Sequence, residues 1–254
     1  LRNDPLSKNV SYNDNSYTDD NRAHAEALAI KYAKLWTIAL PTDASSIAAK
    51  CKEVMTVVAL VYGALTRPGY KPALEFAFMH FLTSSYFIPI IFDALPLVKQ
   101  ARLLRAYVAS FLALFVMKGC PPLYITPELT STNTHHHCTS TATTTTESSP
   151  DENCNPWMHV FSKAIACDDM HAPKAVRALW RISLLDAFPP VCHEKSVIGY
   201  ELPPPINCLH LARLTVDTIT SEPKNTPTNT QKVGDWVHGM IAFDEFWAHQ
   251  DKEL

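Results

Sequence analysis

Glycine is scarce in this sequence, with 6 glycines in 254 residues, whereas a usual share of about 7% would give roughly three times as many. The glycines stand apart, at positions 63, 69, 119, 199, 234 and 239. This spacing excludes the motifs G-x-G-x-x-G, G-x-x-x-x-G-K-[ST] and G-x-S-x-G. A Rossmann dinucleotide site, a phosphate-binding P-loop and an α/β-hydrolase nucleophile elbow are therefore excluded.

Strong net charge, paired cysteines and long apolar runs are also missing. The formal net charge is −3, which does not favour binding to nucleic acid. The 7 cysteines are scattered, with no C-x-x-C pair, as is typical of a reduced, cytoplasmic protein rather than a zinc ribbon. The longest nearly continuous apolar run, Ala106 to Met117, falls short of the roughly 20 residues that span a bilayer. It predicts a core helix and no membrane span.

Apolar side chains recur at three- and four-residue steps along most of the chain, which is the period of a helix with a buried face. The pattern predicts helices over residues 21–40, 44–65, 72–89, 96–118, 173–188, 206–219 and 236–249, and a further helix that begins at Pro156. No convincing alternation of strand length occurs. We therefore expect an all-α fold, a single multi-helix domain with long disordered polar loops.

Three polar stretches interrupt the helical pattern. Residues 1–20 predict a disordered arm ahead of a helical domain over 21–254. Residues 130–155 predict a low-complexity loop and residues 220–231 a second polar loop, because they have too few large apolar side chains to offset the entropy of ordering. The chain begins with Leu1 rather than Met, so we expect it to be part of a longer protein.

His80 is the first candidate functional residue. It lies in an apolar helix that we expect at the centre of the domain, and an imidazole is costly to bury unless it is paired. Its position fits a core histidine that donates to a backbone carbonyl, and it also fits a metal ligand.

The second candidate group is His171, Lys174 and Arg177. Pro173 suits the first turn of a helix, so His171 should lie just before the helix and Lys174 in its first turn, within reach of one point. An ordinary capped helix start explains the same residues. A protonated lysine cannot ligate a metal, so Lys174 would ligate one only if neutral or carboxylated. In its ordinary protonated form Lys174 could instead act as a counter-charge for an acidic substrate.

The third candidate is a histidine-rich segment, for which a function is less well supported. His135, His136, His137 and Cys138 are all potential metal ligands, but they lie in the threonine-rich stretch 130–155. A flexible segment of this kind picks up metal ions adventitiously, so we assign it no function.

Several segments together resemble the questin oxidase-like family of fungal and bacterial oxygenases. They run from Arg67 to Ser85, from Lys99 to Tyr107, over 155–157 and from Asp168 to Leu179, in the family's order. The resemblance covers residues 60–190 and, more loosely, the C-terminal segment. Residues 1–59, with His24 as their only histidine, have no counterpart of the family's histidine-bearing N-terminal region. We therefore expect the chain to correspond to the C-terminal part of the family's chain.

The resemblance implies an oxidoreductase of fungal secondary metabolism, as the whole or a part of the active enzyme. The implied activity is that of a metal-dependent monooxygenase or dioxygenase, which uses O2 to cleave a ring of an anthraquinone-like polyketide in a Baeyer–Villiger-type oxidation. Non-haem iron would be held by histidines and by a lysine that can be carboxylated, with NADPH as a candidate reductant. The matching positions here are His80, His171 and Lys174. Lys174 and Arg177 would act in catalysis. Arg177 or Arg67 could neutralise a phenolate or quinone oxygen, although a solvated surface position explains either arginine as well.

The aromatic residues suggest where such a substrate would bind. We expect a pocket lined by Phe76, Phe81, Tyr86 and Trp180, although aromatic side chains at helical spacing are equally consistent with plain core. The expected partners are a small aromatic polyketide and O2, and the sequence does not determine the oligomeric state. The alternative function is that of a catalytically inactive, truncated helical homologue that acts as an interaction or structural module.

Overall fold

The computed structural model describes residues 4, 19–38, 43–130, 155–186, 206–220, 236–238, 241–242 and 244–250. In this part of the chain the regular structure is helical, and no β-strand extends beyond an isolated bridge residue. The helices are α1 (Asp19–Ala33), α2 (Ala44–Gly63), α3 (Phe76–Ser85), α4 (Ile88–Phe92), α5 (Leu97–Met117), α6 (Pro127–Thr130), α7 (Pro156–Ala166), α8 (His171–Asp186), α9 (Cys208–Thr220) and α10 (Asp244–Ala248). The prediction of an all-α, single-domain fold is confirmed.

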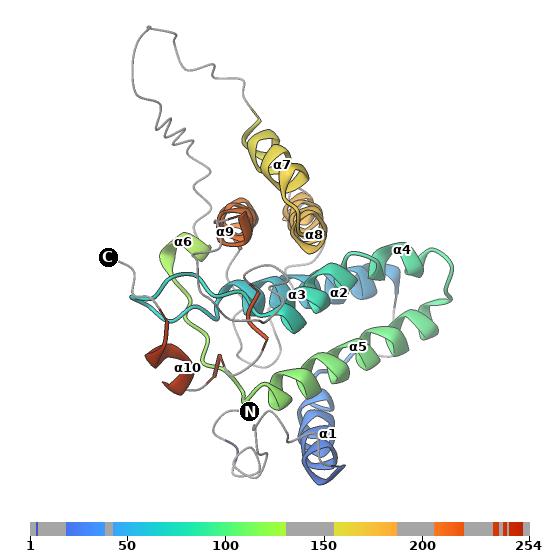
Figure 1. The fold of residues 1–254 in the computed structure, drawn as a ribbon. Coiled ribbons are helices and arrows are strands. Elements are labelled where there is room, and N and C mark those ends of the chain that lie inside the picture. The colour runs from blue at the N-terminus through green and yellow to red at the C-terminus, as the bar shows by residue number, and fades with distance from the viewer. Residues whose placement is uncertain are drawn as a thin grey trace, which may run out of the picture.

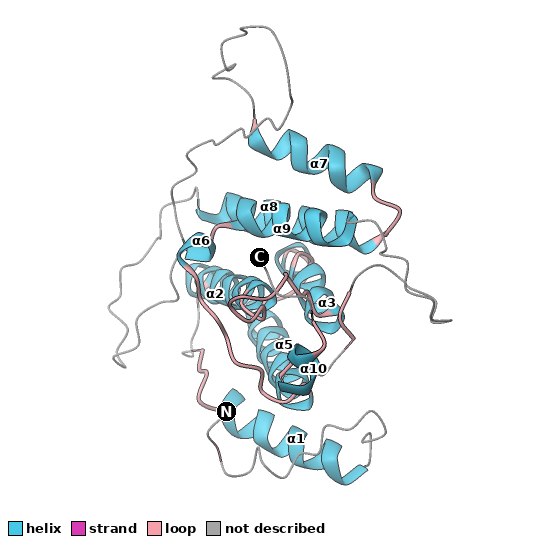
Figure 2. Ribbon diagram, turned by 60° about the vertical axis from the view of Figure 1, so that its left-hand side comes forward, coloured by secondary structure: helices cyan, strands magenta, loops and turns pink. Residues whose placement is uncertain are grey.

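The helices are arranged in layers about α2 and α3 (Figure 1). α2 contacts α3, α4, α5 and α8. On one side of this pair α1 lies across α5, and on the other side α7, α8 and α9 pack against one another (Figure 2). The main hydrophobic core therefore lies between α5 and α8, with α2 and α3 at its centre.

α2 shows how the local sequence builds this core. Asp43 caps its start by accepting a hydrogen bond of 2.7 Å from the backbone N–H of Ser46, which satisfies a free amide of the first turn. At the other end Gly63 faces α9, where a Cβ would lie only 2.2 Å from Cδ2 of Leu211. The missing side chain therefore lets the two helices approach closely.

The prediction of one helix over residues 72–89 is wrong. Residues 71–74 are not helical, and α3 begins at Phe76 because Glu75 accepts a hydrogen bond of 2.9 Å from the backbone N–H of Phe78. The helix ends at Ser85, and Pro89 lies in the first turn of the separate helix α4. Proline is well tolerated in a first turn because it lacks only an N–H that has no partner there.

The predicted helix over 236–249 is also wrong in its first half. Residues 236–238 are extended, and Val237 forms a parallel bridge with Glu75. In that bridge Phe76 donates to the carbonyl of Val237, and Val237 donates to the carbonyl of Leu74, each over 2.8 Å. Only residues 244–248 form the helix α10.

α5 is less buried than a core helix was expected to be. Its fully buried residues are Ala101, Leu104, Phe111 and Val116. α5 is long and apolar enough to cross a membrane. Core helices of water-soluble proteins can have the same length and composition. Its contacts with α1, α2 and α4 favour packing within the protein.

Several predictions concern segments outside the described residues. These segments are most of the arm 1–20, the loop over 131–154 with its histidines 135–137 and Cys138, and most of the second polar loop over 220–231. Asp4 is described, and it accepts hydrogen bonds from Lys31 and Tyr32 of α1. The expected division of the chain into arm, loops and helical domain stays a prediction.

Candidate functional site

Phe76, the first residue of α3, is surrounded by three histidines from distant parts of the chain. The ring of His80, one turn later in α3, lies 4.6 Å from the Phe76 ring, measured between centroids. The corresponding distance is 4.9 Å for His171, the first residue of α8, and 4.7 Å for His238. We call His80, His171 and His238 the histidine cluster.

His80 and His171 are the pair best placed to share a ligand. Their ring centroids are 5.5 Å apart and the rings are nearly perpendicular, at 83°. A metal ion about 2.1 Å from one nitrogen of each ring would bring the two centroids to roughly 5 Å of each other. The observed spacing therefore fits two imidazoles on one metal ion.

The carboxylate of Asp169 caps the start of α8 and lies beside the ring of His171. Its Oδ1 accepts hydrogen bonds from the backbone N–H groups of His171, over 2.7 Å, and Ala172, over 3.1 Å. The same oxygen lies 3.4 Å from Nδ1 of His171, a buried nitrogen that has no hydrogen-bond partner among the described residues. With Nδ1 turned to the carboxylate, Nε2 is the nitrogen left for a ligand, an arrangement typical of metal-binding histidines.

Asp169 is charged at neutral pH. Burial raises the pKa of its carboxyl group, but the backbone N–H groups of His171 and Ala172 and the indole of Trp236 outweigh this effect and bring the pKa below its usual value. A negative charge is therefore present beside the His171 ring at neutral pH. A carboxylate that accepts from the second ring nitrogen is the usual partner of a metal-binding histidine.

His80 was expected to be enclosed on all sides, but its side chain is exposed. The reason is that the buried residues Phe78, Met79 and Leu82 occupy the opposite side of α3. The pKa of His80 is lowered, mainly by burial of part of the ring and then by the nearby His171 and Lys174, and Glu75 acts in the opposite direction. His80 is therefore mostly neutral at pH 7, as a metal ligand must be.

Lys174 and Arg177 follow His171 along α8 at one-turn intervals, and both side chains are exposed. The positive charge of Lys174 contributes to the lowered pKa of His80. The Arg177 guanidinium lies 4.7 Å from the ring centroid of Tyr86 and 5.9 Å from that of Phe87. The structure thus brings His80 and His171 together at Phe76, and it places Arg177 beside Tyr86, another of the predicted pocket aromatics.

Two other aromatics predicted for the pocket pack elsewhere. The ring of Phe81 lies between Tyr107 and Phe111 of α5, with centroid distances of 5.4 and 5.3 Å. Trp180 faces α7, where its ring lies 5.8 Å from that of Phe161. The structure therefore does not place Phe81 or Trp180 beside Phe76.

Sequence reasoning missed His238, Trp236 and Glu75. The backbone bridge at Val237 brings His238 to Phe76 and Trp236 to within 6.2 Å of the same ring. Glu75 is fully buried, caps α3 and forms an ion pair of 2.6 Å with Lys118 at the end of α5. No local spacing marks these residues, because the chain brings them together only through tertiary contacts.

The described residues do not form a complete metal site. No group of three or more His, Cys, Asp or Glu side chains in the described part of the chain is arranged to hold a metal ion. His80 and His171 fit as two ligands, and Lys174 could supply a third only as a carboxylated side chain. A metal ion at these described residues would need further ligands.

The comparisons with known proteins agree with the resemblance found in the sequence. The sequence model of the questin oxidase-like family matches residues 1–179. Oxidoreductase AflY from Aspergillus parasiticus is 30% identical over 142 residues, which are 55% of this chain and 25% of that protein. This chain thus spans about a quarter of the length of that curated relative.

The match extends beyond the segments that carry the resemblance and leaves out one residue of the histidine cluster. It starts at residue 1, so it includes residues 1–59, ahead of the expected range 60–190. That residues 1–59 lack a counterpart of the family's histidine-bearing N-terminal region stays a prediction. The match ends at residue 179, so it contains His80, His171, Lys174 and Arg177 but not His238. On the strength of a match over more than half of its residues, the chain belongs to the questin oxidase-like family.

Proposed function

We propose that this chain forms all or part of an oxidoreductase of secondary metabolism that uses non-haem iron and O2 to oxidise an anthraquinone-like polyketide. The observation that carries the proposal is the pair of imidazoles, His80 and His171, held 5.5 Å apart by two helices. Membership of the questin oxidase-like family and the similarity to an oxidoreductase support the class of activity.

His80, His171 and Lys174 are the residues that would hold the iron. His171 would bind through Nε2, because Nδ1 faces Asp169. His80 is exposed, so its ring can turn toward a shared ion. Lys174 would bind through a carboxylate added to its amine, since an ammonium group cannot donate to a metal. Left unmodified, Lys174 would instead attract an acidic substrate oxygen.

Iron bound here would supply the activation of O2. In a Baeyer–Villiger-type reaction one oxygen atom of O2 is inserted between a carbonyl carbon and the neighbouring ring carbon. The other oxygen atom leaves as water, for which a reductant such as NADPH donates two electrons as a hydride and the solvent one proton. The exposed side of the α3 and α8 pair gives both O2 and a reductant direct access to His80 and Lys174.

Arg177, Tyr86 and Phe76 would contact the aromatic substrate. The guanidinium of Arg177 already lies over the ring of Tyr86, an arrangement in which a cation is attracted to the face of a π-system. Its exposed edge remains able to pair with a phenolate or quinone oxygen, which would orient the ring system toward His80. Phe76 would form the floor beneath the imidazoles.

Metal content tests the proposal directly. Protein from iron-supplemented culture is analysed by mass spectrometry for metals, as the parent chain and as His80→Ala, His171→Ala, Lys174→Ala and His159→Ala. We expect near-stoichiometric iron in the parent, a several-fold loss in the first three variants and no change in His159→Ala, whose histidine is exposed on α7. Equal metal content in all five proteins would overturn the assignment.

A second candidate function is a helical module without catalysis, which would act through protein contacts. It is favoured by the incomplete ligand set of the described residues. The two functions are separated by the same measurement, because a non-catalytic module has no reason to retain iron, whereas the proposed oxidoreductase holds it even in the absence of substrate.

A further inference from the structure

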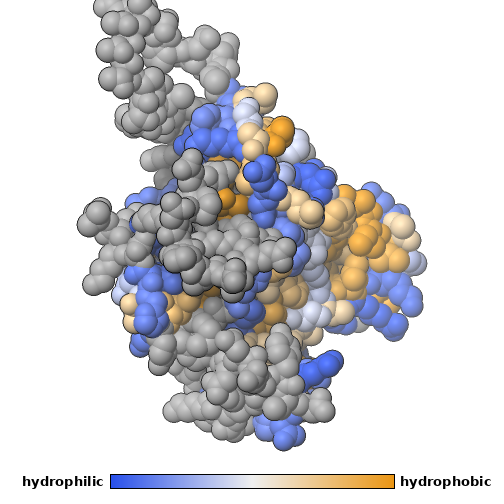
Figure 3. Space-filling view, in the orientation of Figure 1, coloured by the Kyte–Doolittle hydropathy of each residue, from blue (hydrophilic) through white to orange (hydrophobic). Residues whose placement is uncertain are grey.

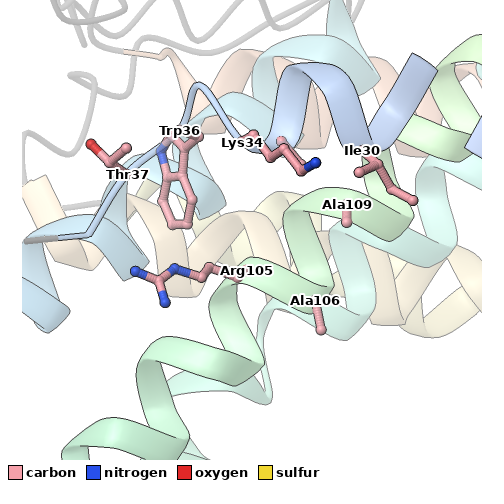
Figure 4. A pocket seen from close by; sticks show the side chains of 8 residues that line it. Ile30, Lys34, Trp36, Thr37, Arg105, Ala106 and Ala109 are labelled. Atoms are coloured by element: carbon pink, nitrogen blue, oxygen red, sulfur yellow. The ribbon is translucent and has the colours of Figure 1, made fainter. Parts of the chain in front are cut away.

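A hollow of about 420 Å³ lies between the end of α1 and the middle of α5. Figure 4 shows it from close by, with Ala106 and Ala109 on α5 and Ile30 on α1. α8, which begins at His171, lies on the opposite side of α2 and α3, and His80 is on α3 itself (Figure 1). The hollow is therefore separate from the candidate metal site, and it belongs to the size range of small-molecule sites, about 300 to 1,000 Å³.

The floor of the hollow is formed by small apolar side chains. Ala106 and Ala109 face it from α5, and a side chain of one carbon leaves room where a larger residue would fill the space between the two helices. Ile30 is half-exposed at its edge, with 49% of its surface open. A flat apolar group laid on these residues would be removed from water on one face.

The rim of the hollow carries two cations, Lys34 and Arg105. Arg105 donates a hydrogen bond of 3.1 Å to the carbonyl of Ile38. In the part of the chain that the structure describes, neither Lys34 nor Arg105 forms an ion pair with a carboxylate. Two positive charges beside an apolar floor favour a ligand with a negative end.

Trp36 forms a fixed wall beside these cations. Its indole N–H donates to Glu53 over 2.8 Å, and the ammonium of Lys50 lies 5.4 Å from its ring centroid. Lys50 also pairs with Glu53 over 2.7 Å, so the carboxylate of Glu53 is already neutralised. The indole is therefore held in place before any ligand arrives, and it extends toward Arg105 (Figure 4).

We propose that this α1/α5 hollow binds a small amphipathic anion with an aromatic body. The aromatic body would lie on Ala106 and Ala109 beside the Trp36 ring, and its carboxylate or sulfonate would pair with Lys34 and Arg105. The proposal does not depend on the iron site, since the two sites share no residue.

Isothermal titration calorimetry of the whole chain tests the proposal, with 2-naphthoate as the probe. The neutral 2-naphthalenemethanol, of nearly the same size and shape, reports on the apolar contribution alone. We expect naphthoate to bind at least tenfold more tightly than the alcohol, and to lose most of that preference when the salt concentration rises, because exposed charges are screened.

Three variants locate the binding. Lys34→Met and Arg105→Met should each weaken naphthoate binding several-fold and leave the alcohol unaffected, whereas Ala109→Phe should abolish binding of both. Arg102→Met is the matched control, because Arg102 is an exposed arginine of the same helix that does not line the hollow. Circular dichroism of each variant shows whether the fold is retained, and the two methionine variants leave the packing of α1 on α5 in place.

Specific results would overturn the proposal. If naphthoate does not bind, or binds as tightly in Lys34→Met, Arg105→Met and Ala109→Phe as in the parent, the hollow is not the site. If the alcohol binds as tightly as naphthoate, the hollow does not select an anion. Binding of an acidic peptide but not of naphthoate would assign the rim to a macromolecule instead.

Discussion

His171 shows how a single side chain is prepared by its neighbours for chemistry. The sequence predicted that His171 lies just before a helix and Lys174 in its first turn, whereas in the structure His171 is itself the first residue of α8. It did not reveal that Asp169 turns one ring nitrogen away from the cluster. That contact depends on the path of the backbone before α8, which residue spacing alone does not define.

Replacing Asp169 by Asn separates its role as the cap of α8 from its role as a negative charge beside His171. The amide oxygen can still accept from the N–H groups of His171 and Ala172, so the start of α8 should stay intact, but the negative charge beside Nδ1 is lost. We expect iron affinity to fall about 10- to 100-fold, the usual effect of removing such a partner. Competition with a chelator measures it.

The neighbouring Asp168 provides the control for this substitution. Its side chain is exposed, so Asp168→Asn should leave iron affinity unchanged. If Asp169→Asn binds iron as tightly as Asp168→Asn does, Asp169 is a helix cap and nothing more.

His210 of α9 gives a prediction about pH. Burial lowers its pKa, Glu128 acts against this, and Arg213 lowers it further. The folded chain therefore keeps His210 neutral, whereas the unfolded chain takes up a proton near a pH of about 6.5. Stability should fall as the pH drops through that value, because the unfolded state then binds more protons.

The variant His210→Gln should lose less stability than the parent between about pH 7 and pH 5. Urea unfolding at the two pH values measures the difference. His159→Gln, with its histidine exposed on α7, should behave as the parent does. An equal loss in His210→Gln and the parent would show that His210 does not contribute.

At the scale of elements, the start of α2 was predicted correctly and the start of α3 was not. The predicted start at residue 44 is confirmed, with Asp43 as the cap. The start of α3 was placed at Pro72, because proline favours a first turn. In the structure α3 begins four residues later, at Phe76, with Glu75 as its cap. The backbone of Glu75 also pairs with Val237. A tertiary partner from the end of the chain decides where this helix begins.

The ion pair of Glu75 and Lys118 joins the start of α3 to the end of α5. Glu75 is fully buried, so Glu75→Gln would leave the Lys118 ammonium without its counter-charge. Removing one partner of a buried pair is destabilising by about 3 to 5 kcal/mol, and we expect a loss in that range in urea unfolding.

The double variant Glu75→Gln with Lys118→Met should recover much of this stability, since an apolar side chain leaves no unpaired charge. If the single variant is as stable as the parent, the pair does not hold the two helices together. If the double variant is no better than the single one, the loss comes from the cap of α3 rather than from the ion pair.

At the scale of the whole molecule, helical periodicity was enough to predict an all-α fold. The positions of the helices relative to one another were not predictable in this way. His80, His171 and His238 come from segments far apart in the chain, and their meeting at Phe76 depends on how α8 and the segment 236–238 pack on α3. Residue spacing within a single sequence does not show which distant segments pack together.

An apolar surface lies at the end of the molecule formed by α4 and the start of α5 (Figure 3). Its exposed members are Phe87, Ile90, Ile91 and Val98. A contiguous apolar patch promotes association in water, so we expect concentration-dependent light scattering that decreases in the double variant Ile90→Glu with Val98→Glu.

The control for this prediction is Ile165→Glu on α7. Ile165 is 80% exposed but lies apart from the α4 and α5 surface, so its substitution should change the scattering little. An equal decrease in both proteins would mean that general negative charge, rather than this surface, limits association.

The bridge between Glu75 and Val237 has a consequence for the order in which the molecule is built. α3 and α8 leave the ribosome well before residues 236–238, and contacts between distant segments form later than local ones. His80 and His171 can therefore come together while Asp169 is still exposed to water. Trp236 and His238 arrive last, and translation of the C-terminal segment completes the surroundings of Phe76.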